Sequence, residues 1–148
     1  TFTQKVNWKD LDFIIVDMPP GTGDTQLTFS QEIKMDGAII ISTPQEVALL
    51  DVIRGIKMFD KLSVKILGLV DNMSFFVGDD GKQYKIFGEG GVKKTAKDYQ
   101  KEFLGEIPIN SEIGKFGDLG MPIVESNPNH EISKIYLNFA EKIKSTYL

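Results

Sequence analysis

The sequence contains no cysteine, one histidine and no long apolar run. Without thiolates, the chain cannot form disulfides, zinc–thiolate sites or cysteine-ligated iron–sulfur sites from its own residues. Its apolar runs are short, such as residues 37–41, and none is long enough to span a membrane. The N-terminal residues do not resemble a secretory signal, so we expect a cytoplasmic location.

Basic residues are outnumbered by acidic ones, 17 to 21, which gives a net charge of −4 and a pI of about 5.0. Binding to nucleic acid or to an anionic membrane needs a basic surface, so this balance argues against both partners. All basic residues except Arg54 are lysines, which makes bidentate arginine clamps on phosphate scarce. A chain of 148 residues is long enough for one domain with its own core.

The chain also lacks a G-x-x-x-x-G-K-[ST] loop, the glycine-lysine loop that cradles phosphates. Another part of a nucleotide site is present. Residues 13–16 form an apolar run, and Asp17 follows it as the first residue of DMPPGTGD. An acid at the end of a buried strand, followed by a Pro-Pro-Gly turn, can place a carboxylate and a free backbone N–H beside a magnesium-bound phosphate. The sequence therefore contains the segment of a nucleotide site that would lie beside the magnesium-bound phosphate, but it lacks the glycine-lysine loop that binds the phosphates.

Strand-like and helix-like segments alternate along the chain. Apolar runs predict four strands, at 11–17, 37–42, 64–71 and 103–107. Apolar residues at helical spacing and capping residues predict helices at 24–34, 45–60, 90–100, 111–119 and from 127 onward. We expect Asp24 to cap the first helix, and Asn127 and Pro128 to begin the last. This alternation predicts an α/β fold with a mostly parallel sheet and helices on both faces.

The segment 72–91 breaks the alternation. It is rich in glycine and aromatic residues, and Asp79, Asp80 and Gly81 lie in its middle, so we expect a hairpin-like excursion. In parallel sheets, ligands bind outside the carboxyl ends of the strands. The predicted strand ends carry Asp17, then Ser42–Pro44, then Asp71–Asn72, then Pro108. We therefore expect a line of polar groups along one edge of the sheet.

Five motifs, in this order and spacing, resemble the Mrp/ApbC family: DMPPGTGD at 17–24, STPQEVALLD at 42–51, DNMS at 71–74, IFGEGG at 86–91 and GDLGMPIV at 117–124. Members of this family are deviant-Walker P-loop ATPases that carry iron–sulfur clusters, and they are related to MinD and ParA. The resemblance covers essentially the whole chain. It implies that residues 1–148 are the C-terminal portion of one P-loop ATPase domain, whose glycine-lysine loop lies upstream.

The resemblance also implies roles for matching residues. Asp17 would hold Mg²⁺ through water, and Gly21 would offer its N–H to the γ-phosphate, as the switch II loop of P-loop NTPases does. Asp24 would lie beside this loop. These three are the expected catalytic residues. The expected contacts with ATP are Pro20, Gly21, Thr43, Asn72 and Pro108. Among them, Asn72 would read the adenine edge. ATP and Mg²⁺ are the expected cofactors, and the expected partners are a second copy or a missing N-terminal half, together with apo iron–sulfur client proteins.

The loop after NMS departs from the family. Members carry a C-P-x-C motif there, which binds a cluster shared across a homodimer, whereas this chain has Gly78 and Gly81 at the corresponding places. We expect no iron–sulfur ligand in this chain, because Asp79 and Asp80 are hard oxygen donors that substitute poorly for thiolates. The loss of both cysteines leaves a second hypothesis open, a non-catalytic dimerising or scaffold module. A MinD-like positioning ATPase is disfavoured because no basic amphipathic membrane helix follows.

Several of these residues also have a purely structural interpretation. Asp17 can cap a turn, Gly21 can supply a turn conformation, and Asn72 can be a turn residue after a strand. We expect His130 to be a solvated surface residue. We expect no ATP hydrolysis by the chain alone, because the γ-phosphate charge is poorly compensated without the upstream loop and its lysine. A sheet without its N-terminal strands should also expose the apolar residues 39–41.

Overall fold

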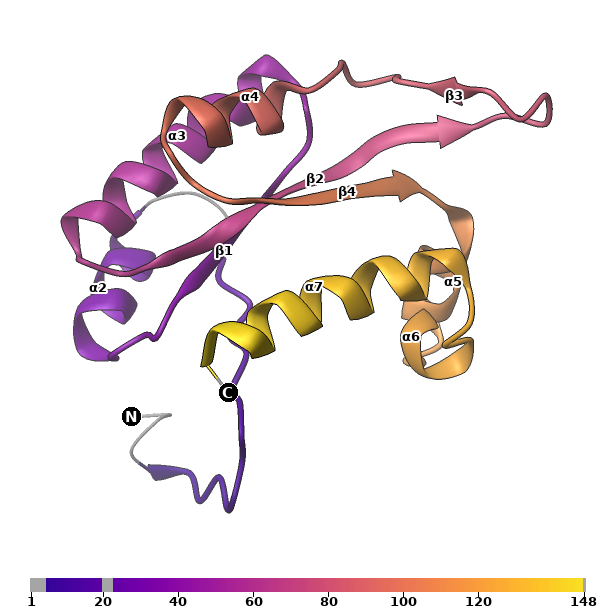
Figure 1. The fold of residues 1–148 in the computed structure, drawn as a ribbon. Coiled ribbons are helices and arrows are strands. Elements are labelled where there is room, and N and C mark those ends of the chain that lie inside the picture. The colour runs from indigo at the N-terminus through magenta and orange to yellow at the C-terminus, as the bar shows by residue number, and fades with distance from the viewer. Residues whose placement is uncertain (1–4, 20–22, 148) are drawn as a thin grey trace.

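A central sheet lies between two helical layers in the computed structural model, which describes residues 5–19 and 23–147. Helices α3 (Glu46–Lys61) and α4 (Gly91–Asp98) cover one face, and α7 (Glu131–Tyr147) covers the other (Figure 1). The α/β fold predicted from the alternating pattern, with helices on both faces of the sheet, is confirmed.

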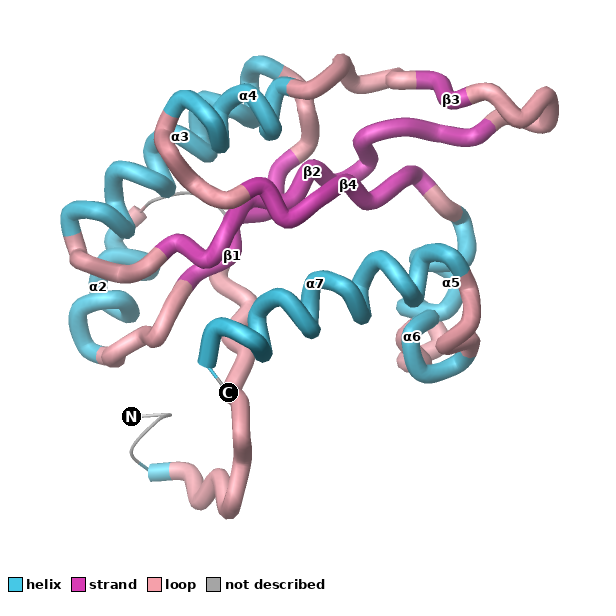
Figure 2. Tube along the Cα trace, in the orientation of Figure 1, coloured by secondary structure: helices cyan, strands magenta, loops and turns pink. Residues whose placement is uncertain are grey.

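Three parallel strands form the sheet, in the order β1 (Ala38–Ser42), β2 (Ile66–Val77) and β4 (Phe103–Ile109). The short strand β3 (Gln83–Tyr84) runs antiparallel to the end of β2. Together, β2 and β3 form a hairpin that projects from the body of the sheet (Figures 1 and 2). The hairpin expected within 72–91 is therefore present.

Two strands continue beyond their predicted ends. β2 continues to Val77 because its last residues pair with both β3 and β4. β4 continues through Pro108, which lacks an N–H but is tolerated because β4 is an edge strand among the described elements. As a result, Asp71, Asn72 and Pro108 lie within strands, and their predicted places at the strand ends were wrong.

The first predicted strand, at 11–17, does not form. Residues 13–16 have no regular secondary structure, and their side chains are exposed, that of Ile15 by 93%. An apolar run becomes a strand when a neighbouring strand satisfies its backbone groups and other elements cover its side chains. No strand among the described residues pairs with this run.

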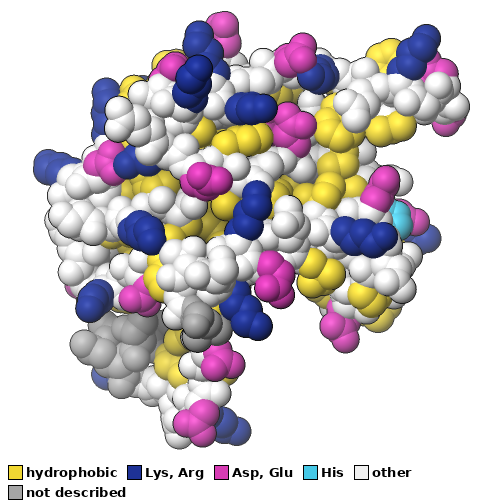
Figure 3. Space-filling model, in the orientation of Figure 1, with side chains coloured by type: hydrophobic (Ala, Val, Ile, Leu, Met, Phe, Trp, Pro, Cys, Tyr) yellow, Lys and Arg dark blue, Asp and Glu magenta, His cyan; other side chains and the backbone are white. Residues whose placement is uncertain are grey.

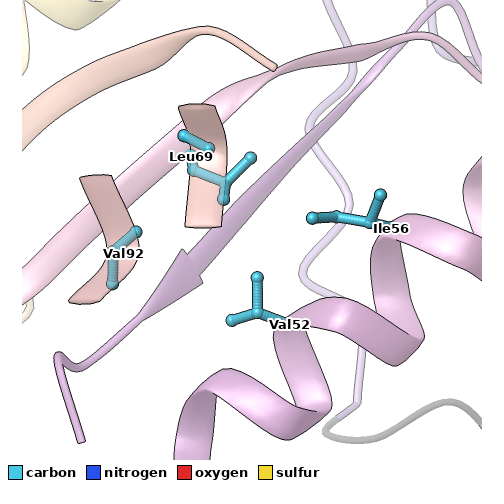
Figure 4. Close-up of a cluster of buried hydrophobic side chains, with 5 residues drawn as sticks. Val52, Ile56, Leu69 and Val92 are labelled. Atoms are coloured by element: carbon cyan, nitrogen blue, oxygen red, sulfur yellow. The ribbon is translucent and has the colours of Figure 1, made fainter. Parts of the chain in front are cut away.

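The core is divided between the two faces of the sheet. On one face, Leu69 of β2 packs with residues of α3 and α4: Val52, Ile56, Val92 and Ala96. Figure 4 shows Val52, Ile56, Leu69 and Val92 converging from the two helices and the strand. The next residue, Val70, points to the other face, where it packs with Leu104, Ile107 and Phe139. This alternation of adjacent residues is the period-two pattern of a strand covered on both faces.

Helix α2 (Asp24–Glu32) begins one residue earlier than a capping role for Asp24 requires. Gly23 is the N-cap residue, and Asp24 is the first residue of the helix. The predicted capping by the Asp24 side chain was therefore wrong as to position, and that side chain lies outside the described part of the molecule.

The last helix also begins later than predicted, at Glu131 rather than at 127–128. Residues 123–126 form a separate short helix, α6 (Ile123–Ser126), after α5 (Ser111–Asp118). The ring of His130 caps α7, because its Nδ1 accepts a hydrogen bond from the N–H of Ile132 at 3.2 Å. Its Nε2 lies 3.1 Å from Glu112 Oε2, so His130 is half-buried between helices and is not a solvated surface residue.

Candidate functional site

The three predicted catalytic residues are not assembled in the described part of the chain. Asp17 is exposed, in the segment without regular structure. Pro20 and Gly21 lie outside the described residues, as does the side chain of Asp24. The remaining predicted contacts, Thr43, Asn72 and Pro108, lie on or beside the sheet.

A row of polar residues crosses the sheet near the end of β1. Asp71 of β2 pairs with Ser42 of β1 on one side and with Glu106 of β4 on the other. Asp71 lies two residues after Leu69, which packs against α3 and α4, so the strand period places Asp71 on that same face. Parallel sheets bind their ligands outside the carboxyl ends of the strands, and this row lies at that end of β1.

Asp71 is the most unusual member of this row. Its side chain is 1% exposed, and its Oδ1 has no hydrogen-bond partner among the described residues. The pKa of this carboxyl is raised to about 6, first by burial and then by the negative charge of Glu106, while Lys85 opposes both effects. A buried carboxylate with an unsatisfied oxygen costs free energy of folding. The stability of the site should therefore depend on whether Asp71 is protonated and on whether a hydrogen-bond donor reaches its Oδ1.

The loop that follows β3 lies against the same edge of the sheet. Its Lys85 forms an ion pair with Glu89, and the hydrogen bond between them raises the pKa of Lys85. The loop ends at Gly91, where an added Cβ would lie 2.8 Å from the carbonyl oxygen of Pro44. Glycine is required at this position because the loop touches the backbone that follows β1.

Two of the predicted ATP contacts are neighbours in space. Asn72 pairs with Ile107, the residue that precedes Pro108. Asn72 is half-buried, whereas Pro108 is buried.

Thr43 follows directly after β1, and its hydroxyl donates a hydrogen bond to Gln45 Oε1 at 2.9 Å. The structure thus places part of the predicted polar line on the sheet, but Asp17 is not on any strand that would join it.

Sequence reasoning missed three residues around this row. Glu106 was treated as part of an apolar strand, although a charged residue inside LGEIPI was a visible signal. Lys85 had no signal, because the loop that carries it reaches the sheet through tertiary structure. The hydroxyl of Ser74 donates to the carbonyl of Ile107 at 3.1 Å inside the protein and links β2 to β4. In the sequence, nothing marks Ser74 as important apart from its place in the DNMS motif.

The hairpin turn has a hydrogen-bond network of its own. The Asp80 carboxylate accepts hydrogen bonds from the N–H of Lys82 at 3.0 Å and from the Tyr84 hydroxyl at 2.8 Å. These bonds, the one from Lys82 first, lower the pKa of Asp80. A Cβ at Gly78 would lie 2.8 Å from the Tyr84 ring, and Gly81 has φ +74, so both positions suit glycine. The turn therefore has no room for a thiolate ligand at 78 while Tyr84 stays in place.

Two further findings limit the candidate sites. Within residues 5–19 and 23–147, no group of three His, Cys, Asp or Glu side chains is arranged to hold a metal ion. Across the same residues, no helix combines the length and the apolar character needed to cross a membrane.

Comparisons of this chain with a family model and with known proteins all indicate the same family. A model of the ParA group, described as NUBPL iron-transfer P-loop NTPase, matches residues 1–144. The iron-sulfur cluster carrier protein of Synechocystis is 46% identical over 96% of this chain and 41% of its own length. The mouse iron-sulfur cluster transfer protein NUBPL is 44% identical over 95% of this chain and 44% of its own length. The chain thus spans about two-fifths of the length of these relatives.

Solved structures show the same fold. An Archaeoglobus fulgidus nucleotide-binding protein, solved in complex with ADP, is 43% identical with a TM-score of 0.68, over 76% of this chain and 47% of that one. The cell division ATPase MinD of Pyrococcus furiosus has the same TM-score at 22% identity, over 91% of this chain and 52% of that one, and supports the fold alone. The chain therefore belongs to the NUBPL-type iron-transfer P-loop NTPase family, the Mrp/ApbC family that its motifs resemble.

Proposed function

We propose that this chain is the C-terminal portion of an ATP-dependent iron–sulfur cluster carrier. The observation that carries the proposal is its identity of 44–46% to iron–sulfur cluster carrier and transfer proteins over almost all of its residues. In this proposal, ATP binding and slow hydrolysis drive the carrying or transfer of clusters to apo client proteins. We also propose that the carrier acts in the cytoplasm.

The proposed nucleotide site combines residues of the N-terminal segment with residues of the sheet edge. Asp17 would hold Mg²⁺ through water, the N–H of Gly21 would bind the γ-phosphate, and Asp24 would support the loop that carries Gly21. Pro20 and Thr43 lie near the phosphates in this proposal, while Asn72 and Pro108 contact the base. The pairing of Asn72 beside Pro108 supports a shared base-binding role. A metal-bound phosphate needs such fixed partners because phosphoryl transfer depends on positioning and charge neutralisation.

The remainder of the domain would complete the sheet. β1 has a neighbour on one edge, and no described strand pairs with its other edge. Ile39 and Ile41 are exposed beside that edge, and residues 13–16 are an unpaired apolar run. We propose that a strand from outside the described residues pairs with β1 and covers these side chains. This association, or a homodimer, would remove an apolar surface that an isolated domain rarely leaves open.

The alternative is a non-catalytic dimerising or scaffold module. The hairpin favours it, because Gly78 and Gly81 replace the family's cysteines and the turn is held by Asp80 and Tyr84. A carrier with this hairpin would need cluster ligands from outside the chain. The intact DMPPGTGD segment favours the ATPase, because a module without nucleotide has no need of a phosphate-facing glycine.

Replacing Asn72 by Ala in the natural gene product tests the proposed base site. We expect the Kd for ATP, measured by isothermal titration calorimetry with Mg²⁺, to rise about tenfold, as is typical for a lost base-edge hydrogen-bond pair. Discrimination between ATP and GTP should fall by a similar factor. Asn138→Ala, at an exposed position on α7, is the matched control and should leave both values unchanged.

Two results would count against the base site. Equal weakening of ATP and GTP by Asn72→Ala would mean that Asn72 supports the fold and does not read the base. Failure of the unmodified gene product to bind any nucleotide would favour the scaffold module instead.

A further inference from the structure

A hollow of about 430 Å³ lies beside α4, at the start of the edge strand β4. Its walls come from two elements that are close in sequence but run in different directions. Four lysines line it, Lys93, Lys94 and Lys97 from α4 and Lys101 from the connection to β4, together with Ala96 and Phe103. Nothing in the sequence shows that Lys101 and Phe103 complete a concave surface with the lysines of α4.

Three of these lysines have uncompensated charge. Lys93, Lys94 and Lys97 are exposed, and none forms an ion pair with an acid in the described residues. Lys101 is partly neutralised, because its Nζ lies 2.6 Å from Asp60. Figure 3 shows dark blue side chains, with magenta ones between them, over the part of the surface where α3 and α4 lie. In a chain with net charge −4, the lysines that line the hollow form a local basic cluster that attracts acidic groups.

The floor of the hollow is apolar and fixed. Phe103 and Ala96 pack against the core cluster beneath α4, so they cannot move freely. Lys93 Nζ lies 5.9 Å from the centre of the Phe103 ring, which places an ammonium group at the rim of an aromatic surface. Lysine side chains also contribute apolar stems while their charged ends stay in water. The hollow therefore combines an apolar floor with a basic rim.

We propose that this hollow docks an acidic segment of a partner protein, in which carboxylates flank one apolar side chain. The carboxylates would face Lys93, Lys94 and Lys97, and the apolar side chain would cover Phe103. A free phosphate fits less well, because it gains nothing from the apolar floor and the rim offers no arginine fork. The docking site is separate from Asp17 and Asn72, so it does not depend on the proposed ATP chemistry.

The test uses the natural gene product and a fluorescein-labelled 12-residue peptide of glutamate with one central leucine. The variant K93Q/K94Q/K97Q removes three positive charges, and K115Q/K134Q/K144Q removes three exposed charges from α5 and α7 as the matched control. Fluorescence anisotropy at low salt should show about tenfold weaker binding for the first variant and less than about twofold for the second. Binding should weaken as salt is raised, because exposed charges are screened. Replacing the leucine by serine should weaken binding by about tenfold.

Three outcomes would overturn the proposal. Equal weakening by both triple variants would mean that the peptide senses net charge and not the hollow. Unchanged binding of the serine peptide would mean that the apolar floor is not used. Complete displacement of the peptide by tripolyphosphate at micromolar concentration would assign the lysines to a phosphate-bearing ligand. Circular dichroism of each variant checks that the helices are retained, which the exposed positions of the lysines lead us to expect.

Discussion

Replacing Asp71 by Asn is expected to raise the free energy of unfolding at pH 7.5 by about 1–3 kcal/mol. Asp71 is buried with an unsatisfied Oδ1, and its pKa is raised from 3.8 to about 6. At pH 7.5 the folded protein therefore holds a buried negative charge beside Glu106. An amide of similar shape removes this charge and can donate a hydrogen bond.

The same substitution should change the pH dependence of stability. Between pH 3.8 and about 6, the unfolded chain has released the Asp71 proton while the folded chain still holds it. The folded state then binds more protons, so the contribution of Asp71 to stability is largest at low pH and is lost as pH rises through about 6. The stability gained in Asp71→Asn should therefore be greatest above pH 6 and small near pH 4.

Urea unfolding at pH 4.5 and pH 7.5 measures both effects. Asp98→Asn, at an exposed position of α4, is the control and should change stability by less than about 0.5 kcal/mol at either pH. A loss of stability in Asp71→Asn at pH 7.5 would contradict this interpretation. It would mean that the carboxylate is held by a favourable partner, such as a bound cation or a donor from the rest of the natural protein.

Replacing adjacent isoleucines of β1 by alanine should change stability by different amounts, depending on how much of the domain is present. Ile40 packs against the core beneath α3, whereas Ile41 is 62% exposed. In the 148-residue chain, Ile40→Ala should cost about 2 kcal/mol, and Ile41→Ala should cost less than about 0.5 kcal/mol. In the natural gene product, we expect both substitutions to cost about 2–4 kcal/mol, because the proposed neighbouring strand covers Ile41.

Chemical denaturation of the four variants gives these values, and the two isoleucines serve as controls for each other. A small cost for Ile41→Ala in the natural gene product would show that this face of β1 stays open. The proposal that the chain is one portion of a larger sheet would then fail. Equal, large costs in the 148-residue chain would contradict the exposure of Ile41 itself.

The fold could be predicted where a segment carries its own signal. Adjacent residues Leu69 and Val70 are both apolar, which identified a strand covered on both faces. Helix α3 was recognised from one apolar face that includes Val52 and Ile56. The strand expected at 11–17 failed for a different reason: its apolar residues indicate burial, but burial depends on neighbours that the described residues do not provide. The start of α7 was misplaced because His130 supplies a cap that sequence preferences assign to Asn127.

The candidate site was predictable in position more than in detail. The predicted strand ends pointed to a line of polar groups at one edge of the sheet, and Asp71 was named there as a polar end residue. Its burial, and its pairing with Glu106, depend on the register between β2 and β4, which sequence alone does not fix. The contribution of Lys85 depends on a loop folding back over the sheet. The geometry around Pro20 and Gly21 lies outside the described residues, so their roles remain predictions.

The most direct test of the account is the rate of Mg²⁺-dependent ATP hydrolysis by the natural gene product, compared between the unmodified protein and Asp17→Ala. We predict slow turnover that falls about 100-fold in the variant, because the role proposed for Asp17 is to hold the metal that neutralises phosphate charge. The 148-residue chain should stay at the background rate. Turnover unchanged in Asp17→Ala would contradict the account, as would Mg²⁺-dependent turnover by the 148-residue chain that disappears in its own Asp17→Ala variant.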